Sequence, residues 1–450
     1  MRRRGLKCIE AANKGRVGGN DCGKIRYRMT IISRLKRRFY FVGAGYFRVW
    51  ANISLKRWRP RVIAVTGSVG KTTMLGLIET QLKRQAHYSH NANSAFGIAF
   101  DILGLKGVTG SRWRWVGLIL AAPLRAISHR HSEKFYVVEI DGERPRETEY
   151  IAKWLKPEVT VWVSLGRSHA VFYEQVVAQG EFADVDAAIA YEFAALPKCT
   201  KKLVLIDGEN ETMREVTKDI EAKVVGLDQD RVLGYEVSPE RSEFKIGKRE
   251  FEFRNPMPRD IGMQLVMLEE LMGYLGQPVN YDLQGFVMPP GRSNFLYGKN
   301  GVKLVDSSYN AHLISMASVL AMVREMRAQN KWLVIGDIID QGKLEGGEHK
   351  KLAELILAAK PKQVVLVGRR TAKYTFPLLK GKLAVESFRE PQQALQYLEK
   401  NLTGKETVIF KGSQYLEWIV EKLLANPADA ALLPRQTEAQ RRRRAGWGLT

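Results

Sequence analysis

The hydrophobic and polar positions of the chain alternate between short, wholly apolar runs and longer stretches with helical spacing. In the first half, apolar runs predict buried strands at 62–66, 135–140, 159–164 and 202–207. Helical patterns lie between these runs, and one of them, 71–84, follows the first strand after a short loop. Strands that alternate with helices are typical of a mostly parallel α/β sheet, which we predict for this half.

The second half of the chain restarts this pattern after a turn-rich segment, "MPPGRSN" (288–294). Short strands at 232–254 and a helix at 262–276 precede this segment. Beyond it, the pattern predicts strands at 302–307, 331–337, 363–368 and 406–412, and helices at 313–328, 349–359, 391–400 and 414–424. Such a succession of strand–helix units is typical of a Rossmann-like domain. We therefore predict an α/β protein with a central domain at 61–289 and a Rossmann-like C-terminal domain at 290–434.

Composition is that of an ordinary globular protein, but the charge is unusual. Hydrophobic residues make up 45% of the 450 residues, enough for two or three domain cores. The net charge is +23, and residues 1–60 contribute +15 of it, with 17 Lys and Arg against two acidic residues. Residues 435–450 contribute a further +4, so the body between these two ends is nearly balanced. Three widely spaced cysteines favour a reducing compartment, and we expect a cytoplasmic protein.

The two basic ends allow several interpretations. Residues 1–28 are expected to be unstructured, and the basic tail at 435–450 is either solvated or a contact for nucleic acid or anionic lipid. Between residues 37 and 60, aromatic and aliphatic residues are interleaved with arginines. This is typical of a segment at a membrane surface, although a helix packed on the next domain has the same pattern. No apolar run is long enough for a transmembrane helix, and the basic N-terminus has no apolar stretch behind it, so we expect no signal peptide. We therefore expect residues 29–60 to contact anionic lipid at the inner face of the membrane.

The stretch "VIAVTGSVGKTT" (62–73) carries the clearest chemical signal, although Val65 stands where such loops usually have a first glycine. Glycines let backbone N–H groups close around phosphates, and the helix N-terminus that follows adds positive potential. Lys71 would reach the β- and γ-phosphates of a nucleotide, and the Thr72 hydroxyl would hold Mg²⁺. The predicted nucleotide-binding loop consists of Thr66, Gly67, Ser68, Val69, Gly70, Lys71, Thr72 and Thr73.

This stretch resembles the ATP loop of the Mur ligases, which join amino acids onto the peptidoglycan precursor. The resemblance continues in order along residues 61–425, in particular to the branch of the family that adds D-alanyl-D-alanine. Its pieces are "VTGSVGKTT" (65–73), "NANSAFG" (91–97), "VVEIDGERP" (137–145), "SLGRSHAVFY" (164–173), "PGRSN" (290–294), "LVDSSYNAHLISM" (304–316), "VIGDIIDQG" (334–342) and "FKGSQYLEWIV" (410–420). No single piece after the loop is specific, but their shared order is.

The resemblance implies a P-loop central domain, ATP and Mg²⁺ as cofactors, and ligation of a carboxylate to an amine. It implies Glu139 and His169 as catalytic residues and metal ligands beside Thr72, with Lys71 and Arg292 as catalytic cations. Further nucleotide contacts are implied at Gln264, Arg292, Asp306 and Asn310, and substrate contacts at Asn91, Asn93 and Lys411. The implied substrates are a cell-wall precursor or other acidic acceptor and an amino acid or dipeptide.

Several positions depart from the family pattern. Phe193 stands where a carbamylated, metal-binding lysine is common, and Gln264 stands where an asparagine is usual. Ser307 interrupts a pair of aspartates, His312 replaces an asparagine, and Gln414 replaces an arginine. The short basic lead also takes the place of the domain that grips the UDP-sugar end of the substrate. These departures leave ATP binding intact but put full ligase turnover in question.

Three functions remain open on the sequence. The first is an ATP-dependent amide ligase of cell-wall precursor synthesis. The second is an ATP-binding relative with little or no ligase activity and a regulatory or interaction role, which Phe193, Gln264 and Ser307 favour. The third, a nucleic-acid-dependent ATPase, is disfavoured because the basic charge is terminal, so we do not expect a nucleic-acid partner. If Phe193 is simply a core residue, Lys198 is the nearest alternative lysine.

Overall fold

The computed structural model describes residues 21–90, 92–107, 112–339, 341–413 and 415–449. The chain divides into two compact units, and the first, unit 1, contains residues 1–59 and 95–132. Unit 2 contains residues 60–94 and 133–450. Residues 95–132 lie inside the range predicted for the central domain, yet they group with the N-terminal segment.

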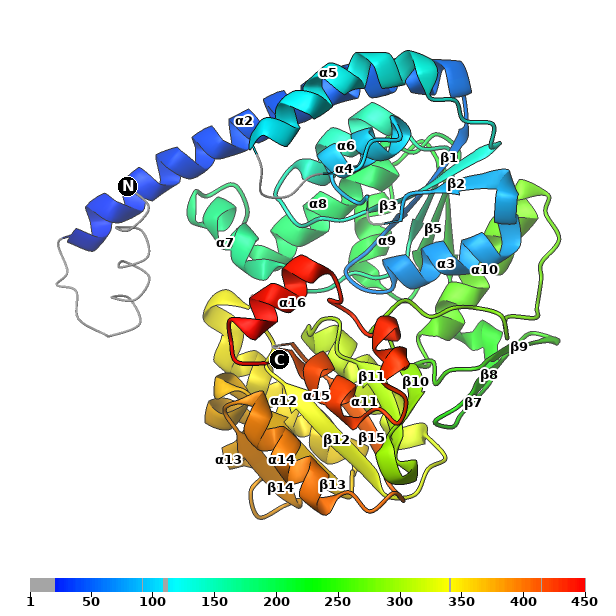
Figure 1. The fold of residues 1–450 in the computed structure, drawn as a ribbon. Helices are drawn as coiled ribbons and strands as arrows, with labels where there is room; N and C mark the ends of the chain where they lie inside the picture. The colour runs from blue at the N-terminus through cyan, green and yellow to red at the C-terminus, as the bar shows by residue number, and fades with distance from the viewer. Residues whose placement is uncertain (1–20, 91, 108–111, 340, 414, 450) are drawn as a thin grey trace. The chain divides into compact units, whose positions relative to one another are not determined.

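Unit 1 is built from helices. They are α2 (Asp21–Trp58), the long blue helix in Figure 1, α4 (Ala95–Ile102) and α5 (Arg112–Ser128). Phe47 of α2 is buried against Phe100 of α4, with ring centroids 4.8 Å apart in an edge-to-face arrangement. The segment at 21–28, expected to be unstructured, is helical, whereas residues 1–20 lie outside the described residues. No described helix has the length and apolarity needed to span a bilayer.

The first sheet of unit 2 is parallel throughout, with six strands in the order β2-β3-β1-β4-β5-β6. Its strands are β1 (Arg61–Thr66), β2 (Ala86–Tyr88), β3 (Phe135–Ile140), β4 (Val159–Trp162), β5 (Leu203–Asp207) and β6 (Lys223–Leu227). The helices between them are α3 (Lys71–Leu82), α6 (Glu147–Leu155), α7 (Ala170–Ala178), α8 (Val185–Cys199) and α9 (Glu211–Thr217). Val65 of β1 lies opposite Glu139 of β3, so the carboxyl ends of neighbouring strands meet at one edge.

Both faces of this sheet are buried because successive residues of a strand point to opposite sides. On one face, Val65 packs with α3, with α10 (Ile261–Leu275) and with a small antiparallel sheet of β7 (Val232–Val237), β8 (Ser242–Ile246) and β9 (Arg249–Phe253). On the other face, Trp162 and Val204 pack with α7, α8 and α9. The apolar runs of the sequence therefore correspond to strands that are covered on both sides.

The second sheet has six strands in the order β10-β11-β15-β12-β13-β14, of which only the β10–β11 pair is antiparallel. Its strands are β10 (Asn294–Tyr297), β11 (Lys303–Ser307), β12 (Lys331–Gly336), β13 (Gln363–Val367), β14 (Val385–Phe388) and β15 (Thr407–Lys411). Its helices are α11 (Leu313–Glu325), α12 (Glu345–Ala359), α13 (Phe376–Leu379), α14 (Pro391–Asn401) and α15 (Leu416–Leu423). Ile335 packs towards α11 and α12, whereas Val334 packs towards α14 and α15.

The described chain also contains short helical turns. They are η1 (Lys83–Gln85), η2 (Gln229–Arg231), η3 (Lys299–Gly301), η4 (Gly342–Leu344), η5 (Thr371–Thr375) and η6 (Pro427–Leu432). The predicted fold class is confirmed.

The basic C-terminal segment folds onto unit 2 and is not a solvated tail. It forms α16 (Glu438–Ala445), drawn in red in Figure 1. Arg444 is buried, and its guanidinium lies 2.8 Å from the carboxylate of Glu421 on α15. Arg435 lies 3.1 Å from the carboxylate of Glu417 on the same helix. Two ion pairs therefore hold this segment against α15, although its sequence is that of a solvated basic tail.

Candidate active site

The loop between β1 and α3 ends on a glycine with a constrained backbone. Gly70 has a φ of 84°, in the left-handed region, and immediately precedes Lys71 at the start of α3. A Cβ atom on Gly70 would lie 2.5 Å from Nε2 of Gln264, so both the backbone angle and the close neighbour favour glycine. The loop thus brings the N-terminus of α3 to the carboxyl edge of the first sheet, where an anion is favoured.

Two serine hydroxyl groups fix the shape of this loop. Ser68 Oγ donates to the carbonyl of Gly166 at 2.6 Å. Val69 N donates to Oγ of Ser164 at 2.9 Å. Both partners follow β4, so the loop is tied to the strand next to β1 and is preorganised for a ligand.

Lys71, Asp141 and His169 form a row of charged and polar groups beside the loop. Lys71 Nζ lies 2.6 Å from the carbonyl oxygen of Gly67 and 3.2 Å from Oδ1 of Asp141. The other carboxylate oxygen of Asp141 lies 4.0 Å from Nε2 of His169, which precedes α7. Burial opposes ionisation of Asp141, but the neighbouring Lys71 and His169 and the hydrogen bonds from Lys71 and the backbone of Gly142 outweigh it and lower its pKa. Asp141 was not among the predicted site residues.

The donor atoms in this region fit a divalent cation. Thr72, Glu139, Asp141 and His169 all line the same cleft, and Glu139 is only 8% exposed. Carboxylate and hydroxyl oxygens are the ligands that Mg²⁺ prefers. Two carboxylates at the wall of one cleft also create negative potential that a cation would relieve. Thr72, Glu139 and His169 stay the predicted ligands, and the structure adds Asp141 as a neighbour of the same kind.

The C-terminal domain contributes cations to the opposite wall. One guanidinium nitrogen of Arg292 donates to Oγ1 of Thr72 at 3.1 Å. The same guanidinium lies over the ring of Tyr309, with its Cζ 4.6 Å from the ring centroid. Cζ of Arg435 lies 5.9 Å from the same centroid. Arg435 also donates to the carbonyl of Tyr309, which fixes the tyrosine from the side of the C-terminal segment.

Lys411 and Asn310 meet at the ends of β15 and β11. Lys411 Nζ donates to the carbonyl oxygen of Asn310 at 2.5 Å. Burial, together with the charge of Arg292, lowers the pKa of Lys411 to about 7. Asp306 is fully buried, which raises its pKa, and one of its carboxylate oxygens accepts from the backbone N–H of Ser308 at 2.9 Å.

His312, one of the departures from the family pattern, also reaches this region. Its ring centroid lies 5.6 Å from that of His169. Its Nε2 lies 3.1 Å from the side-chain amide nitrogen of Asn310. Burial and the nearby His169 lower the pKa of His312 to about 3, so its imidazole is neutral at physiological pH.

Most of these groups line a cleft of about 890 Å³, a size typical of a ligand-binding site. Of the predicted residues, the cleft is lined by Ser68, Val69, Gly70, Lys71, Thr72, Thr73, Asn93, Glu139, His169, Gln264, Arg292, Asn310 and Lys411. Thr66, Gly67 and Asp306 lie behind this lining, and the Thr66 hydroxyl donates to the carbonyl of Ile140. Asn91 and Gln414 lie outside the described residues. Lining residues that the sequence analysis missed include Asp141, Tyr309, Arg435 and Gln440.

Phe193 is a fully buried core residue on α8. Its ring packs near Trp162, with centroids 6.4 Å apart, and a Cβ atom on Gly142 would lie 3.2 Å from its Cζ. The neighbouring Glu192 accepts from the backbone N–H groups of Arg146 and Thr148, each at 2.6 Å. Burial raises the pKa of Glu192 to about 7. Glu192 therefore caps the start of α6, and Phe193 fills the space behind the end of β3.

Lys198, the alternative lysine, lies near the C-terminal end of α8. It is exposed in the last turn of α8, and its ammonium lies 5.6 Å from the ring centroid of Tyr191. It does not line the cleft. Neither position 193 nor position 198 supplies an amine to this cleft.

Replacing Arg435 by alanine is expected to weaken nucleotide binding severalfold and to lower stability by about 1–3 kcal/mol. The variant loses the cation beside Tyr309 and leaves the buried Glu417 without its ion pair. Isothermal titration with ATP and a thermal melt would measure the two effects. Arg442→Ala is the matched control, because Arg442 only pairs with Glu438 at the surface. Equal affinity and equal stability of both variants would contradict a role for Arg435.

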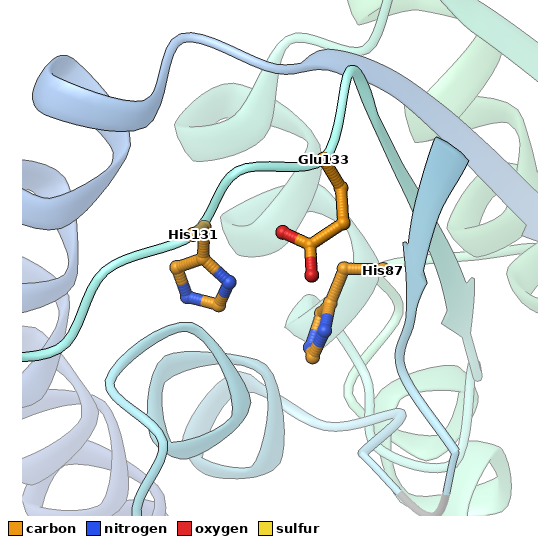
Figure 2. Close-up of side chains that lie close together, drawn as sticks. All are labelled: His87, His131 and Glu133. Carbon is orange, nitrogen blue, oxygen red and sulfur yellow. The ribbon is translucent and has the colours of Figure 1, made fainter. Parts of the chain in front are cut away.

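Two histidines and a glutamate are drawn in Figure 2. His87 and Glu133 belong to unit 2. His131 belongs to unit 1, where its ring stacks on Trp58 with centroids 4.0 Å apart. Because the three side chains are divided between the two units, we assign no metal site to them.

Comparison with known proteins supports the resemblance seen in the sequence. The family model described as Mur ligase, glutamate ligase domain matches residues 291–414. Residues 291–414 are therefore similar to the glutamate ligase domain of the Mur ligases. This range begins at Gly291, just before β10, and covers the second sheet through β15. The predicted resemblance to the Mur ligases is confirmed.

Curated relatives match a larger share of the chain than the family model does. A UDP-N-acetylmuramoyl-tripeptide–D-alanyl-D-alanine ligase of Bacillus subtilis is 23% identical over 389 residues, covering 84% of this chain and 79% of its own length. The ligase of the same name from Rickettsia prowazekii is 21% identical over 373 residues, covering 79% of this chain and 76% of its own length. Both alignments extend well beyond the Mur ligase domain at 291–414.

Solved structures share the fold. MurF from Acinetobacter baumannii superposes with a TM-score of 0.65 at 19% identity, covering 85% of this chain and 81% of that one. MurF ligase from Thermotoga maritima, solved in complex with ADP, gives a TM-score of 0.64 at 18% identity, with coverages of 82% and 80%. At this identity the likeness concerns the fold, a P-loop domain followed by a Rossmann-like domain.

Proposed function

We propose that this chain is an ATP-dependent amide ligase of the Mur type. The observation that carries the proposal is the cleft in which Arg292 of the segment matched by the Mur ligase model contacts Thr72 of the phosphate loop, with Glu139 and His169 lining the same cleft. Relatives named as D-alanyl-D-alanine ligases of the UDP-N-acetylmuramoyl-tripeptide support this class of reaction. The acceptor is then a cell-wall precursor or related acid, and the added group is an amino acid or dipeptide.

The chemistry begins with transfer of the γ-phosphoryl group of ATP to the acceptor carboxylate, which releases ADP and gives an acyl phosphate. The amine then attacks the acyl carbon, the amide bond forms, and inorganic phosphate leaves. Lys71 and the loop N–H groups hold the phosphates, and Arg292 brings a second cation to the loop from the other domain. Mg²⁺, held by Thr72, Glu139 and His169, would neutralise the charge on the transferring phosphoryl group.

A second candidate is an ATP-binding relative with little or no ligase turnover. The observation that favours it is the burial of Phe193 in the core, since no lysine takes the place of the carbamylated residue. Magnesium commonly keeps several waters, so a missing protein ligand weakens the site without abolishing it. We therefore favour an active enzyme with a high Mg²⁺ requirement.

The partners we propose include an anionic membrane surface. Residues 29–60 carry aromatic side chains among Lys and Arg, a composition that is attracted to acidic lipid headgroups. A lipid-linked or other acidic acceptor at the inner face of the membrane would fit this segment. Binding to acidic vesicles should fall as salt rises, because the attraction is electrostatic.

One assay separates the two candidates: ADP release by the full chain, with and without a panel of peptidoglycan precursors, amino acids and D-alanyl-D-alanine. The Mur-type ligase releases ADP only when both acceptor and amine are present, and amide product accumulates with it. ATP binding without acceptor-dependent ADP under any Mg²⁺ concentration would establish the non-ligating relative instead.

Glu139→Gln tests the proposed metal ligand. We expect acceptor-dependent ADP release to fall by roughly a hundredfold or more, because a carboxylate at the reacting phosphoryl group loses its charge. ATP affinity should change much less, since the loop and Lys71 are untouched. Glu143→Gln, at another cleft carboxylate, is the matched control. Equal turnover in the Glu139 variant and the wild type would contradict the assignment.

A further inference from the structure

Unit 1 exposes an unusual number of large apolar side chains. Those on α2 are Phe39, Val42, Tyr46 and Val49, and those on α5 are Val116, Ile119, Leu120, Leu124 and Ile127. These nine are close to half of the 21 such residues found exposed in the described chain, although unit 1 is much the smaller unit. Scattered exposed apolar residues are normal, but clustering on this scale marks an interaction surface.

The exposed residues of each helix share one face. On α5, Leu120 and Leu124 are one turn apart, whereas the buried residues Leu118, Ala122 and Ala126 repeat every four residues on the other side. On α2, the exposed positions 39, 42, 46 and 49 likewise recur at intervals of three and four. Each helix therefore has a buried apolar face and a second, exposed apolar face.

The two exposed faces adjoin. Tyr46 of α2 donates its hydroxyl to the carbonyl oxygen of Ile119 on α5 at 2.8 Å, and both residues are exposed. Arg57, near the end of α2, donates to the carbonyl of Ile127 at 2.6 Å. Hydrogen bonds at two points along the pair hold the helices side by side. The exposed apolar residues of these two neighbouring helices are here together called the α2–α5 face.

The α2–α5 face lacks the charged residues that normally cover a solvent-exposed helix. The stretch "WVGLILAAPL" (115–124) of α5 contains no charged residue, and residues 39–55 of α2 contain one, Arg48. Basic residues stand at the ends instead, with Lys56, Arg59, Arg114 and Arg130 all exposed. An apolar surface bordered by cations is the pattern of a helix that lies in the membrane interface.

Charge decides between lipid and a second copy of the chain as the occupant. Two copies joined through this face would bring their basic borders, with Lys56, Arg59 and Arg114, against each other. An acidic lipid surface instead neutralises these charges while it covers the apolar side chains. No described helix is suited to crossing the membrane, so the face would lie in the headgroup region without spanning.

We propose that the α2–α5 face binds an anionic membrane surface, with α5 contributing as much of the contact as α2. The inference rests on the membrane partner proposed above and extends it to residues 112–128, which the sequence analysis did not connect with lipid. In this arrangement, Leu120 and Leu124 enter the apolar edge of the headgroup layer. The arginines at the helix ends pair with lipid phosphates.

The test is flotation of the full chain with vesicles of phosphatidylcholine alone or mixed with phosphatidylglycerol. The wild type should bind the mixed vesicles, and Leu120→Gln/Leu124→Gln should bind them roughly tenfold more weakly or worse, because two apolar side chains lose their burial. Leu233→Gln is the matched control: Leu233 is 63% exposed on β7 of unit 2, against 67% and 71% for Leu120 and Leu124. Its binding should equal that of the wild type.

Each other outcome contradicts the proposal. Equal flotation of the double variant and the wild type would mean that α5 does not touch lipid. A wild type that binds neither kind of vesicle, but whose dimer dissociates in the double variant, would assign the face to a second copy. Acceptor-dependent ADP release is measured on the same samples, and all the residues that line the cleft belong to unit 2. A failure of membrane binding is therefore distinguishable from a failure of the proposed ligase.

Discussion

Lys71→Ala is expected to lose ATP affinity by at least roughly a hundredfold while keeping its fold, in line with about 2–5 kcal/mol for removing one member of a buried charge pair. Lys71 Nζ lies between the carbonyl oxygen of Gly67 and the carboxylate of Asp141, at the start of α3. Removing it takes away the cation nearest the loop. It also leaves Asp141 without that partner, so a negative charge then faces the incoming triphosphate.

Isothermal titration with MgATP would measure the loss, and circular dichroism with a thermal melt would verify the fold. Lys153→Ala is a suitable control, because Lys153 forms an exposed surface pair with Glu149. The double variant Lys71→Ala/Asp141→Asn should recover part of the lost affinity, since it removes the uncompensated carboxylate. Wild-type affinity in Lys71→Ala would show that the loop does not bind the phosphates.

Local patterns in the sequence predicted most of the fold and the side of the cleft formed by the phosphate loop. The glycines and Lys71 are adjacent in sequence, and the buried strands are short apolar runs. Asp141 was overlooked although a signal existed. It comes directly after the end of β3, and so lies at the same carboxyl edge of the sheet as the predicted ligand Glu139.

The side of the cleft formed by Tyr309 and Arg435 could not be predicted in the same way, because it depends on contacts between segments far apart in the sequence. Arg435 pairs with Glu417 and contacts Tyr309, and the sequence shows only an arginine before a basic run. The sequence analysis placed helical patterns before the second strand but gave no bounds for α5, since "WVGLILAAPL" is apolar on all sides and contains Pro123. Such a stretch has no amphipathic period from which a surface helix can be identified.

Phe193 stands where the family commonly has a metal-binding lysine. Its surroundings in the structure show which groups a lysine side chain at this position would contact. The side chain is fully buried, near Trp162 and against the backbone of Gly142. Removing a buried aromatic ring costs about 3–5 kcal/mol, and an ammonium placed in the same space adds a desolvation penalty. We therefore expect Phe193→Lys to be strongly destabilised and not to gain ligase activity.

Urea unfolding and ADP release, with and without bicarbonate, would measure both effects, and Phe193→Leu separates the loss of the ring from the burial of charge. Phe193→Leu should lose less stability than Phe193→Lys, because leucine leaves a cavity but no buried charge.

Lys198→Ala should resemble the wild type, since Lys198 is exposed and does not line the cleft. A collapse of bicarbonate-sensitive activity in Lys198→Ala would mean that the family motif is aligned a few residues too early. A stable Phe193→Lys with a lower Mg²⁺ requirement would mean that the lysine reaches the metal site past Gly142, and that the core around α8 is less tightly packed than its burial indicates.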